Sequence, residues 1–273
     1  MILVVGDLVD DIGVRPLSTV NPASDTVSEI RMTPGGSAAN VAAWLGHLGS
    51  AVRFVGRCGV DGVSRHTVAL EAFGVDARIS GDRELPTATI VLTLDEHADR
   101  TMYVDRAANT TLSAADVPVD VWADVTWLHL TGYSFFDDGV RPLALELIAE
   151  AGRRGAGVSV DPSSLGFLEA AGRDAVLSWL SDTDLVFPND DEQGFLGLDG
   201  DGVVVTLGPD GASFRGETVA ADATEVLDTT GAGDAFCAGF LASWTVAGEV
   251  EAALAAGARS AGQCVSLRGA RPR

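Results

Sequence analysis

The sequence predicts an α/β fold with a doubly wound, mainly parallel sheet covered by helices on both faces, and a small antiparallel β lid beside it. Short β-branched runs alternate with helix-like segments along most of the 273 residues. Runs such as Val203–Val205 are continuously apolar, which is typical of parallel strands buried on both faces. Two other stretches alternate in polarity, as half-exposed strands do.

The expected elements follow one another as strand and helix along the chain. The strand-like runs are Ile2–Val5, Val52–Val55, Val125–Leu130, Val158–Val160, Leu185–Phe187 and Val203–Leu207. The helix-like segments are Ser37–Leu48, Val63–Phe73, Val140–Arg154, Ala170–Leu180, Asp190–Leu196, Ala235–Val246 and Glu249–Leu267. Strands that alternate with helices in this way form parallel neighbours.

The lid is expected from the two stretches that break this alternation. Residues 12–34 are polar and helix-poor, and Thr26–Met32 alternates as a strand. Thr87–Leu94 and Arg100–Val104 read as a hairpin around a turn at 95–99. We expect segments 12–34 and 84–108 to form a lid over the carboxyl ends of the parallel strands, where such sheets bind ligands. The lid would belong to one domain spanning residues 1–273.

Composition excludes several functions. A formal net charge of −21 argues against nucleic acid and anionic membranes as partners. All 18 basic residues are arginine, which rules out a phosphate-binding loop with its lysine and any Schiff base on a lysine. No apolar run reaches the ~18 residues of a membrane span. The chain starts as a strand without a basic leader, and its 3 cysteines lack metal-ligand spacing. We therefore expect a cytoplasmic protein.

The run Asp228–Phe236 is the strongest chemical signal. It places two glycines and the carboxylate of Asp234 at the start of an apolar helix. The first amides of a helix have no partner within it and bind anions well. The amides of Gly231, Ala232 and Gly233 would form an anion site, and Asp234 would take a proton from an attacking hydroxyl during phosphoryl transfer. Alternatively, Asp234 only stabilises the helix dipole.

A second glycine turn opens the helix within Pro34–Gly49. Gly35 and Gly36 precede it, and Asn40 lies about one turn inside. An amide side chain both donates and accepts hydrogen bonds, as recognition of a sugar hydroxyl requires. Alternatively, the glycines form a plain loop and Asn40 binds local backbone.

These two segments together resemble the signature regions of the ribokinase-like (PfkB) carbohydrate kinase family. Gly6 followed by Asp11 looks like the first strand and the sugar-binding aspartate of that family. Asn189–Glu192 looks like its Asn-x-x-Glu motif, and Val203–Gly211 looks like its late nucleotide-binding strand and turn. The resemblance implies a ribokinase-like fold, ATP and Mg²⁺ as cofactors, and K⁺ as a further candidate.

The resemblance also implies roles for individual residues. For substrate binding these are Asp11, Gly35, Gly36, Asn40 and Arg106; for nucleotide binding Asn189, Thr206, Gly208 and Gly211; for Mg²⁺, through water, Glu192; and for a monovalent cation Asp228 and Thr230. Asp7 and Asp10 rival Asp11 on spacing alone, and Arg106 could simply be solvated. A hairpin turn at Pro209 would account for the nearby glycines without a nucleotide.

The expected activity is ATP-dependent phosphotransfer to a primary hydroxyl of a small sugar or nucleoside, and the lid could support a homodimer. A non-catalytic sensor on a kinase fold is the main alternative. A hydroxymethyl heterocycle is a third acceptor class, which the second glycine motif disfavours. Part of the chain looks like 2-keto-3-deoxygluconate kinases, but Asp161–Ser164 lacks the arginine that those kinases usually place shortly after the aspartate.

Overall fold

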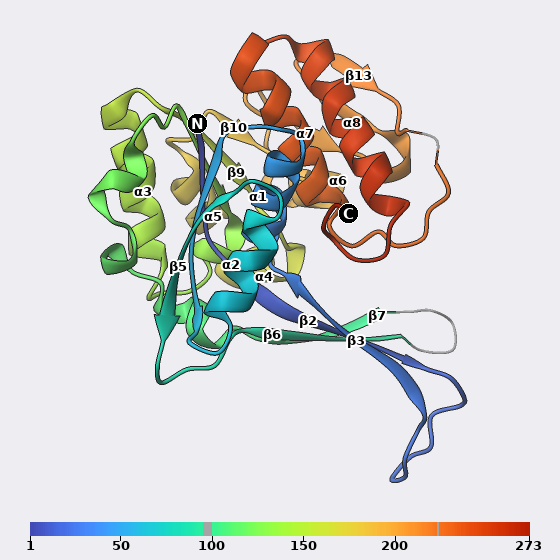
Figure 1. Ribbon diagram of the computed structural model, residues 1–273. Helices are drawn as coiled ribbons and strands as arrows, with labels where there is room; N and C mark the ends of the chain where they lie inside the picture. Colours follow the sequence, from blue (N-terminus) through green and yellow to red (C-terminus); the bar gives the residue numbers. More distant parts are fainter. Residues whose placement is uncertain (95–99, 223) are drawn as a thin grey trace.

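A six-stranded parallel sheet forms the centre of the molecule (Figure 1). The computed structural model describes residues 1–94, 100–222 and 224–273, so the turn expected at 95–99 lies outside the described residues. The strand order of the central sheet is β10-β9-β8-β1-β4-β5, and every neighbouring pair runs parallel, as the sequence predicts. The strands are β1 (Ile2–Val5), β4 (Val52–Gly59), β5 (Asp76–Asp82), β8 (Trp127–Thr131), β9 (Gly157–Asp161) and β10 (Leu185–Val186).

Helices cover both faces of this sheet, because its strands are apolar on both sides. Ile2 and Val4 of β1 join one hydrophobic core, and Leu3 and Val5 join the other. The first core holds α1 (Ser37–His47), α2 (Val63–Glu71), α7 (Ala232–Ala247) and α8 (Val250–Val265). The second holds α3 (Arg141–Arg154), α4 (Leu165–Ala171), α5 (Arg173–Leu180) and α6 (Asp190–Leu196). Short 3-10 helices span Ala107–Thr111, Ala114–Asp116, Val119–Trp122, Gly132–Ser134 and Gly208–Asp210.

Three elements differ from the expectation. The helix expected at Ala170–Leu180 is divided into α4 and α5 at Gly172, whose φ of 85° a right-handed helix cannot contain. Strand β5 had no clear sequence signal, and its residues are mostly half-buried. The strand expected at Val203–Leu207 is shortened to β11 (Val205–Thr206), which pairs antiparallel with β12 (Ala212–Phe214), followed by β13 (Glu217–Val219).

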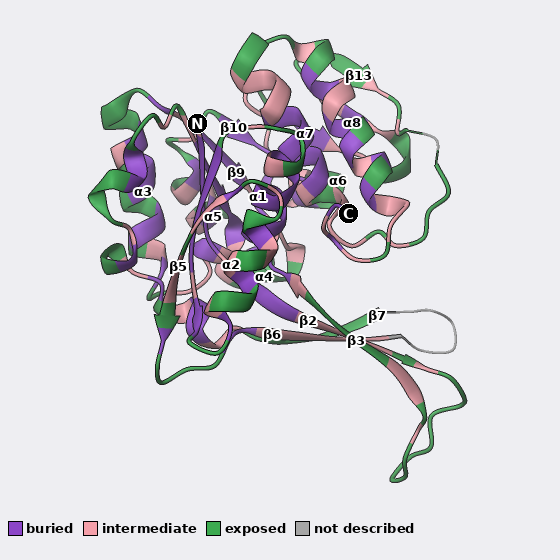
Figure 2. Ribbon diagram, viewed as in Figure 1, coloured by how far each residue is buried: buried purple, intermediate pink, exposed green. Residues whose placement is uncertain are grey.

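The lid is a separate four-stranded sheet of order β3-β2-β6-β7. It consists of β2 (Val9–Pro16), β3 (Ser28–Gly35), β6 (Thr89–Leu94) and β7 (Arg100–Asp105). Strands β6 and β7 form the expected antiparallel hairpin, and β3 also pairs antiparallel with β2, a strand that was not predicted. Strands β2 and β6 pair in parallel and join the two pairs into one sheet. Figure 2 shows the lid strands mostly half-buried or exposed where they project from a buried body.

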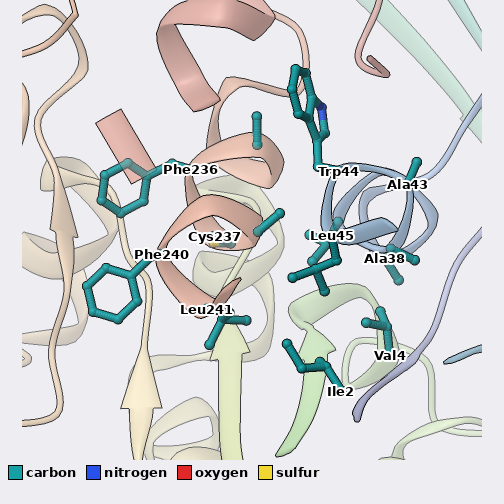
Figure 3. Packing of buried hydrophobic residues seen from close by; sticks show 14 of the residues in the cluster. Ile2, Val4, Ala38, Ala43, Trp44, Leu45, Phe236, Cys237, Phe240 and Leu241 are labelled. Carbon is teal, nitrogen blue, oxygen red and sulfur yellow. The ribbon is translucent and has the colours of Figure 1, made fainter. Parts of the chain in front are cut away.

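Helices α1 and α7 pack against each other above β1, as the close-up in Figure 3 shows. Small side chains such as Ala38 and Ala43 on α1 are fully buried, as is Ala238 on α7. Small residues at a contact allow two helix backbones to approach closely. This packing brings the glycine turn before α1 close to the glycine turn before α7. Within the described ranges, no helix combines the length and apolar character that a membrane crossing needs.

Candidate active site

A cavity of about 310 Å³ lies at the carboxyl ends of the parallel strands. Asp7 follows β1, Tyr133 follows β8, Asp161 ends β9 and Phe187 follows β10, and all four line it. The opposite wall comes from lid strands β6 and β7, through residues such as Ile90 and Met102. The position matches the expected ligand site of an α/β sheet.

Most of the residues predicted for the site surround this one cavity. The predicted residues that line it are Asp11, Gly36, Asn40, Arg106, Asn189, Glu192, Thr206, Thr230, Gly231, Ala232, Gly233 and Asp234. Those outside its lining are Gly35, Gly208, Gly211 and Asp228. The two glycine motifs, 197 residues apart between Ser37 and Asp234, therefore meet at one place.

Asp234 is held at the start of α7 by side chains of α1. Its Oδ1 accepts a hydrogen bond from Ser37 Oγ (2.7 Å), and its Oδ2 accepts one from Asn40 Nδ2 (2.9 Å). Burial raises the pKa of the Asp234 carboxyl to about 6, and the hydrogen bonds from Asn40 and Ser37 oppose that rise. A carboxylate that is ionised at neutral pH with a pKa close to it suits a general base.

The turn before α7 gives the first amides of this helix no side-chain cap. Gly231 is the N-cap in a left-handed conformation (φ 76°) and offers no side chain to cap the helix. The Ala232 amide donates to Thr229 O at 3.3 Å. The cavity is lined by Gly231, Ala232 and Gly233 beside Asp234, so the start of a helix, where anions are commonly bound, and a carboxylate share one wall.

The three aspartates near β2 have different surroundings. Asp7 accepts hydrogen bonds from the amides of Ser37 (2.8 Å) and Ala38 (3.1 Å), so it caps α1 from a distance. Asp10 pairs with Arg65 of α2. Asp11 faces the cavity, and burial raises the pKa of its carboxyl to about 7. Of the three, Asp11 has the setting of a ligand group.

The glycines before α1 are required by close contacts. A Cβ on Gly35 would lie 1.8 Å from Asp11 Oδ2, so only glycine leaves room for that carboxylate. Gly36 has a φ of 97°, and a Cβ there would lie 2.5 Å from Leu8 Cα. Their main role in the structure is to bring Asp11 and the start of α1 together.

The nucleotide residues predicted from the Asn-x-x-Glu motif form a capping box at α6. Asn189 Oδ1 accepts from the Glu192 amide (2.9 Å), and Glu192 Oε2 accepts from the Asn189 amide (3.0 Å). Glu192 is buried and lines the cavity, and burial raises the pKa of its carboxyl. The motif thus has a structural role besides any role with a metal.

The glycines of the late turn shape a hairpin beside the cavity. Thr206 lines the cavity at the end of β11. Gly211 has a φ of 101°, and a Cβ there would lie 1.8 Å from Val219 O. Gly208 also has a positive φ of 56°. These glycines let β11, β12 and β13 turn back tightly and place Thr206 at the wall.

Asp228 and Thr230, predicted at a cation site, are joined to the turn after α8. Asp228 Oδ1 accepts from Thr230 N (3.0 Å) and Thr230 Oγ1 (2.7 Å). Asp228 Oδ2 accepts from the Gly269 amide (3.0 Å). The carboxylate therefore holds the glycine turn of α7 against the segment that follows α8.

Arg106 lies at the base of the lid and lines the cavity. It donates from Nη2 to Tyr133 O (2.5 Å), and its guanidinium carbon lies 6.0 Å from the centre of the Tyr133 ring. This contact fixes the arginine on the body of the protein, not in solvent.

The charged residues at the site that were not predicted include Asp161 and Arg271, besides Asp105 in the cavity wall. Asp161 lines the cavity, and burial raises its pKa well above the ordinary value for a carboxyl. Its signal in the sequence is its position directly after the buried run Val158–Val160. Arg271 donates from Nε to Asn40 Oδ1 (3.1 Å) and from Nη2 to Gly35 O (2.9 Å). No sequence pattern marks Arg271.

The family model of the pfkB family carbohydrate kinases matches residues 1–273. The chain is 31% identical over 252 residues to a fructokinase of Klebsiella pneumoniae, covering 82% of this chain and 81% of that protein. It is 33% identical over 265 residues to an ATP-dependent ribose-1-phosphate kinase of Halopiger xanaduensis, covering 89% and 86%.

Solved structures share the fold over nearly the whole chain. An adenosine kinase from Sinorhizobium meliloti has a TM-score of 0.86 at 25% identity, over 99% of this chain and 95% of that one. A structure from Escherichia coli in complex with ATP and Mg²⁺ has a TM-score of 0.85 at 23% identity, over 98% and 94%. The chain belongs to the pfkB family of carbohydrate kinases, and it is a carbohydrate or nucleoside kinase.

Proposed function

We propose that this protein transfers the γ-phosphoryl group of ATP to a primary hydroxyl of a small sugar or nucleoside. One observation carries the proposal: Asp234, the uncapped start of α7 and the carboxylate of Asp11 face a single cavity. Phosphoryl transfer is mainly a matter of positioning and of stabilising charge. These groups can position a hydroxyl, remove its proton and hold a phosphate.

The proton and the bonds are accounted for by groups at the cavity. Asp234 accepts the proton of the acceptor hydroxyl as that oxygen attacks the γ-phosphorus. The bond from the γ-phosphorus to the bridging oxygen breaks, and ADP leaves. Amides at the start of α7 stabilise the charge that develops on the phosphoryl oxygens. Asp11 and Asn40 hold other hydroxyls of the acceptor, with the Gly35 and Gly36 backbone beneath them.

The nucleotide would lie towards α6 and β11, where Asn189 and Thr206 line the cavity and Gly208 and Gly211 shape the turn. Glu192 fits Mg²⁺ bound through water, because its carboxylate is buried at the cavity wall and Mg²⁺ retains several waters. The metal would neutralise charge on the phosphates.

Asp228 and Thr230 are the proposed side chains at a monovalent cation site. Stimulation of turnover by K⁺ but not by choline would support that site.

The acceptor has the chemistry of a polyol, since the carboxylates of Asp11 and Asp234 and the amide of Asn40 line the end of the cavity where it would bind. Relatives act on fructose, ribose 1-phosphate and adenosine by name, so the panel of acceptors must include ketoses, pentose phosphates and nucleosides. Arg106 lies close enough to the cavity to contact such an acceptor.

The lid suits a second copy of the chain. Strand β3 exposes apolar side chains, since Ile30 is 65% and Met32 60% exposed, and Val27 just before it is 73% exposed. Exposed apolar strands with free edges favour pairing with another surface. Sedimentation analysis of the wild type and of Ile30→Asp tests the dimer, which the charge should weaken.

The test of the activity is turnover of ATP to ADP with Mg²⁺ against the acceptor panel. Asp234→Asn should lower kcat by about 10²–10⁴-fold, because the general base is lost. Asp174→Asn is the matched control, since Asp174 also lies in the first turn of a helix but is exposed away from the cavity. Turnover of Asp234→Asn close to that of the control would contradict the proposal, as would a flat panel from folded, ATP-binding protein.

A further inference from the structure

The segment after α8 is fixed against both helices of the site. Trp44 Nε1, on α1, donates to Ala270 O (2.9 Å) in the protein interior. Ala270 also lies against the turn before α7, where a Cβ added to Gly231 would be 2.5 Å from the Cβ of Ala270. Asp228 holds the neighbouring amide of Gly269. The backbone before Arg271 therefore has little freedom to move relative to α1 and α7.

From this fixed segment, Arg271 reaches under the acceptor end of the cavity. Its Nε donates to Asn40 Oδ1 (3.1 Å), and its Nη2 donates to Gly35 O (2.9 Å). Its Nη1 is buried and has no hydrogen-bond partner among the described residues. Burial lowers the pKa of this guanidinium to about 10, so it remains charged at neutral pH. The carboxylates of Asp11, Asp234 and Asp7 offset the cost of withdrawing this charge from water.

The contacts with Arg271 and with Asp234 together decide which way the Asn40 amide points. The amide has one accepting end and one donating end. Arg271 can only donate and the ionised Asp234 carboxylate can only accept, so the oxygen of Asn40 faces Arg271 and the nitrogen faces Asp234 Oδ2 (2.9 Å). In the reverse orientation, the Asn40 NH₂ group would face the guanidinium and its oxygen would face the carboxylate.

We propose that Arg271 is a positioning residue of the phosphoryl-transfer site, which orients Asn40 so that Asn40 holds Asp234, and which supplies the positive charge beneath Asp11 and Asp234. The proposal rests on the function proposed above. Arg271 does not line the cavity, so it acts through Asn40 and through its field, not by touching the acceptor.

The charges around Asp234 agree with this role. The titratable groups that face it are Asp7, Asp11, Tyr133, Asp161, Cys237, Cys264 and Arg271, and Glu192 lies beyond Asp161. Arg271 is the one cation in this described set. Its charge lowers the pKa of both Asp11 and Asp234, against burial and the neighbouring carboxylates, which raise it.

The first experiment compares Arg271→Met and Arg271→Lys with Arg268→Met, a matched control because Arg268 lies on the same segment and is exposed. In Arg271→Met, we expect kcat to fall about 10- to 100-fold with a smaller change in KM, because a small misplacement of reacting groups has that effect. The acid limb of the kcat profile should move to higher pH. Arg271→Lys keeps the charge and should restore the pH profile more than the rate. Wild-type kcat in Arg271→Met contradicts the proposal.

A double-mutant cycle with Asn40→Leu tests whether Arg271 acts through Asn40. Residues that act as one unit give non-additive effects. We therefore expect Asn40→Leu with Arg271→Met to be little worse than Asn40→Leu alone. Fully additive losses of kcat would contradict the path through Asn40.

A readout without turnover separates this proposal from the proposed function. The side-chain NH₂ resonance of Asn40 in ¹⁵N-labelled protein is assigned by its loss in Asn40→Leu. Arg271→Met and Arg271→Lys should move this resonance, and Arg268→Met should not. An unmoved resonance overturns the proposal even if the wild type is an active kinase. A moved resonance supports it even if no acceptor in the panel is phosphorylated, a result that would count against the proposed function alone.

Discussion

Helices α6 and α7 both carry an acidic residue at the third position of the first turn, but they use it differently. At α6, Glu192 bends back to the amide of its own N-cap, Asn189, and completes a capping box. At α7, the N-cap is Gly231, which has no side chain, and Asp234 points away to Ser37 and Asn40 of α1. One carboxylate closes its helix end, and the other leaves its helix end open.

The N-cap residue accounts for this difference. Asn189 can accept a hydrogen bond from the helix while its own amide binds Glu192. Gly231 adopts a left-handed conformation that turns the chain sharply and brings α7 against Ala270. A helix end without a side-chain cap keeps its amides for a ligand, at some cost to stability.

Replacing Gly231 with alanine should disturb the open end most. Alanine is strained at a φ of 76°, and its Cβ would meet Ala270, so we expect a loss of about 2–4 kcal/mol in the free energy of unfolding. Gly216→Ala is the matched control, because Gly216 has a φ of 82° but open space around it, and should lose only about 1 kcal/mol. Chemical denaturation measures both, and equal losses would show that contact with Ala270 has no energetic weight.

Neutralising the carboxylate of Asp11, which lines the same cavity as the start of α7, should stabilise the protein. Burial raises the pKa of Asp11 to about 7, so the folded chain binds this proton more tightly than the unfolded chain. The free energy of unfolding must then fall as pH rises from about 4 to about 7. Asp11→Asn should therefore be more stable than the wild type by about 2 kcal/mol at pH 8 and equal to it below pH 4. An unchanged difference across this range would mean that Asp11 is not desolvated.

Substitutions in the capping box at the start of α6 should have the smallest effect on stability, and they should separate helix capping from metal binding. Asn189→Ala removes the cap and should cost about 1 kcal/mol of stability. Glu192→Gln keeps a side chain that can accept from the Asn189 amide, so its stability should change by less than about 0.5 kcal/mol. If Glu192 also serves Mg²⁺, this variant needs more Mg²⁺ for half-maximal turnover. Thermal melts and Mg²⁺ titrations give the two readings.

The fold and the chemical centre of the site could be predicted from local sequence. The alternation of strand-like and helix-like segments predicted the parallel sheet. Glycine turns followed by Asn40 and Asp234 predicted the starts of the two helices at the site. The break at Gly172 was missed because the surrounding residues keep a helical pattern. The parallel pairing of β2 with β6 was missed because nothing local to either strand states which neighbour it will have.

The sequence by itself determined the alternation of strands and helices, the family and the chemical groups at the cavity. Each of these depends on residue types at short spacing, where backbone geometry leaves few choices. Only the tertiary structure decided that Asp7 and Asp11 both line the cavity while Asp10 pairs with Arg65, and that Arg271 lies beneath Asn40. Those outcomes depend on contacts between segments far apart in the chain. The packing of α1 against α7 and the segment after α8 creates them.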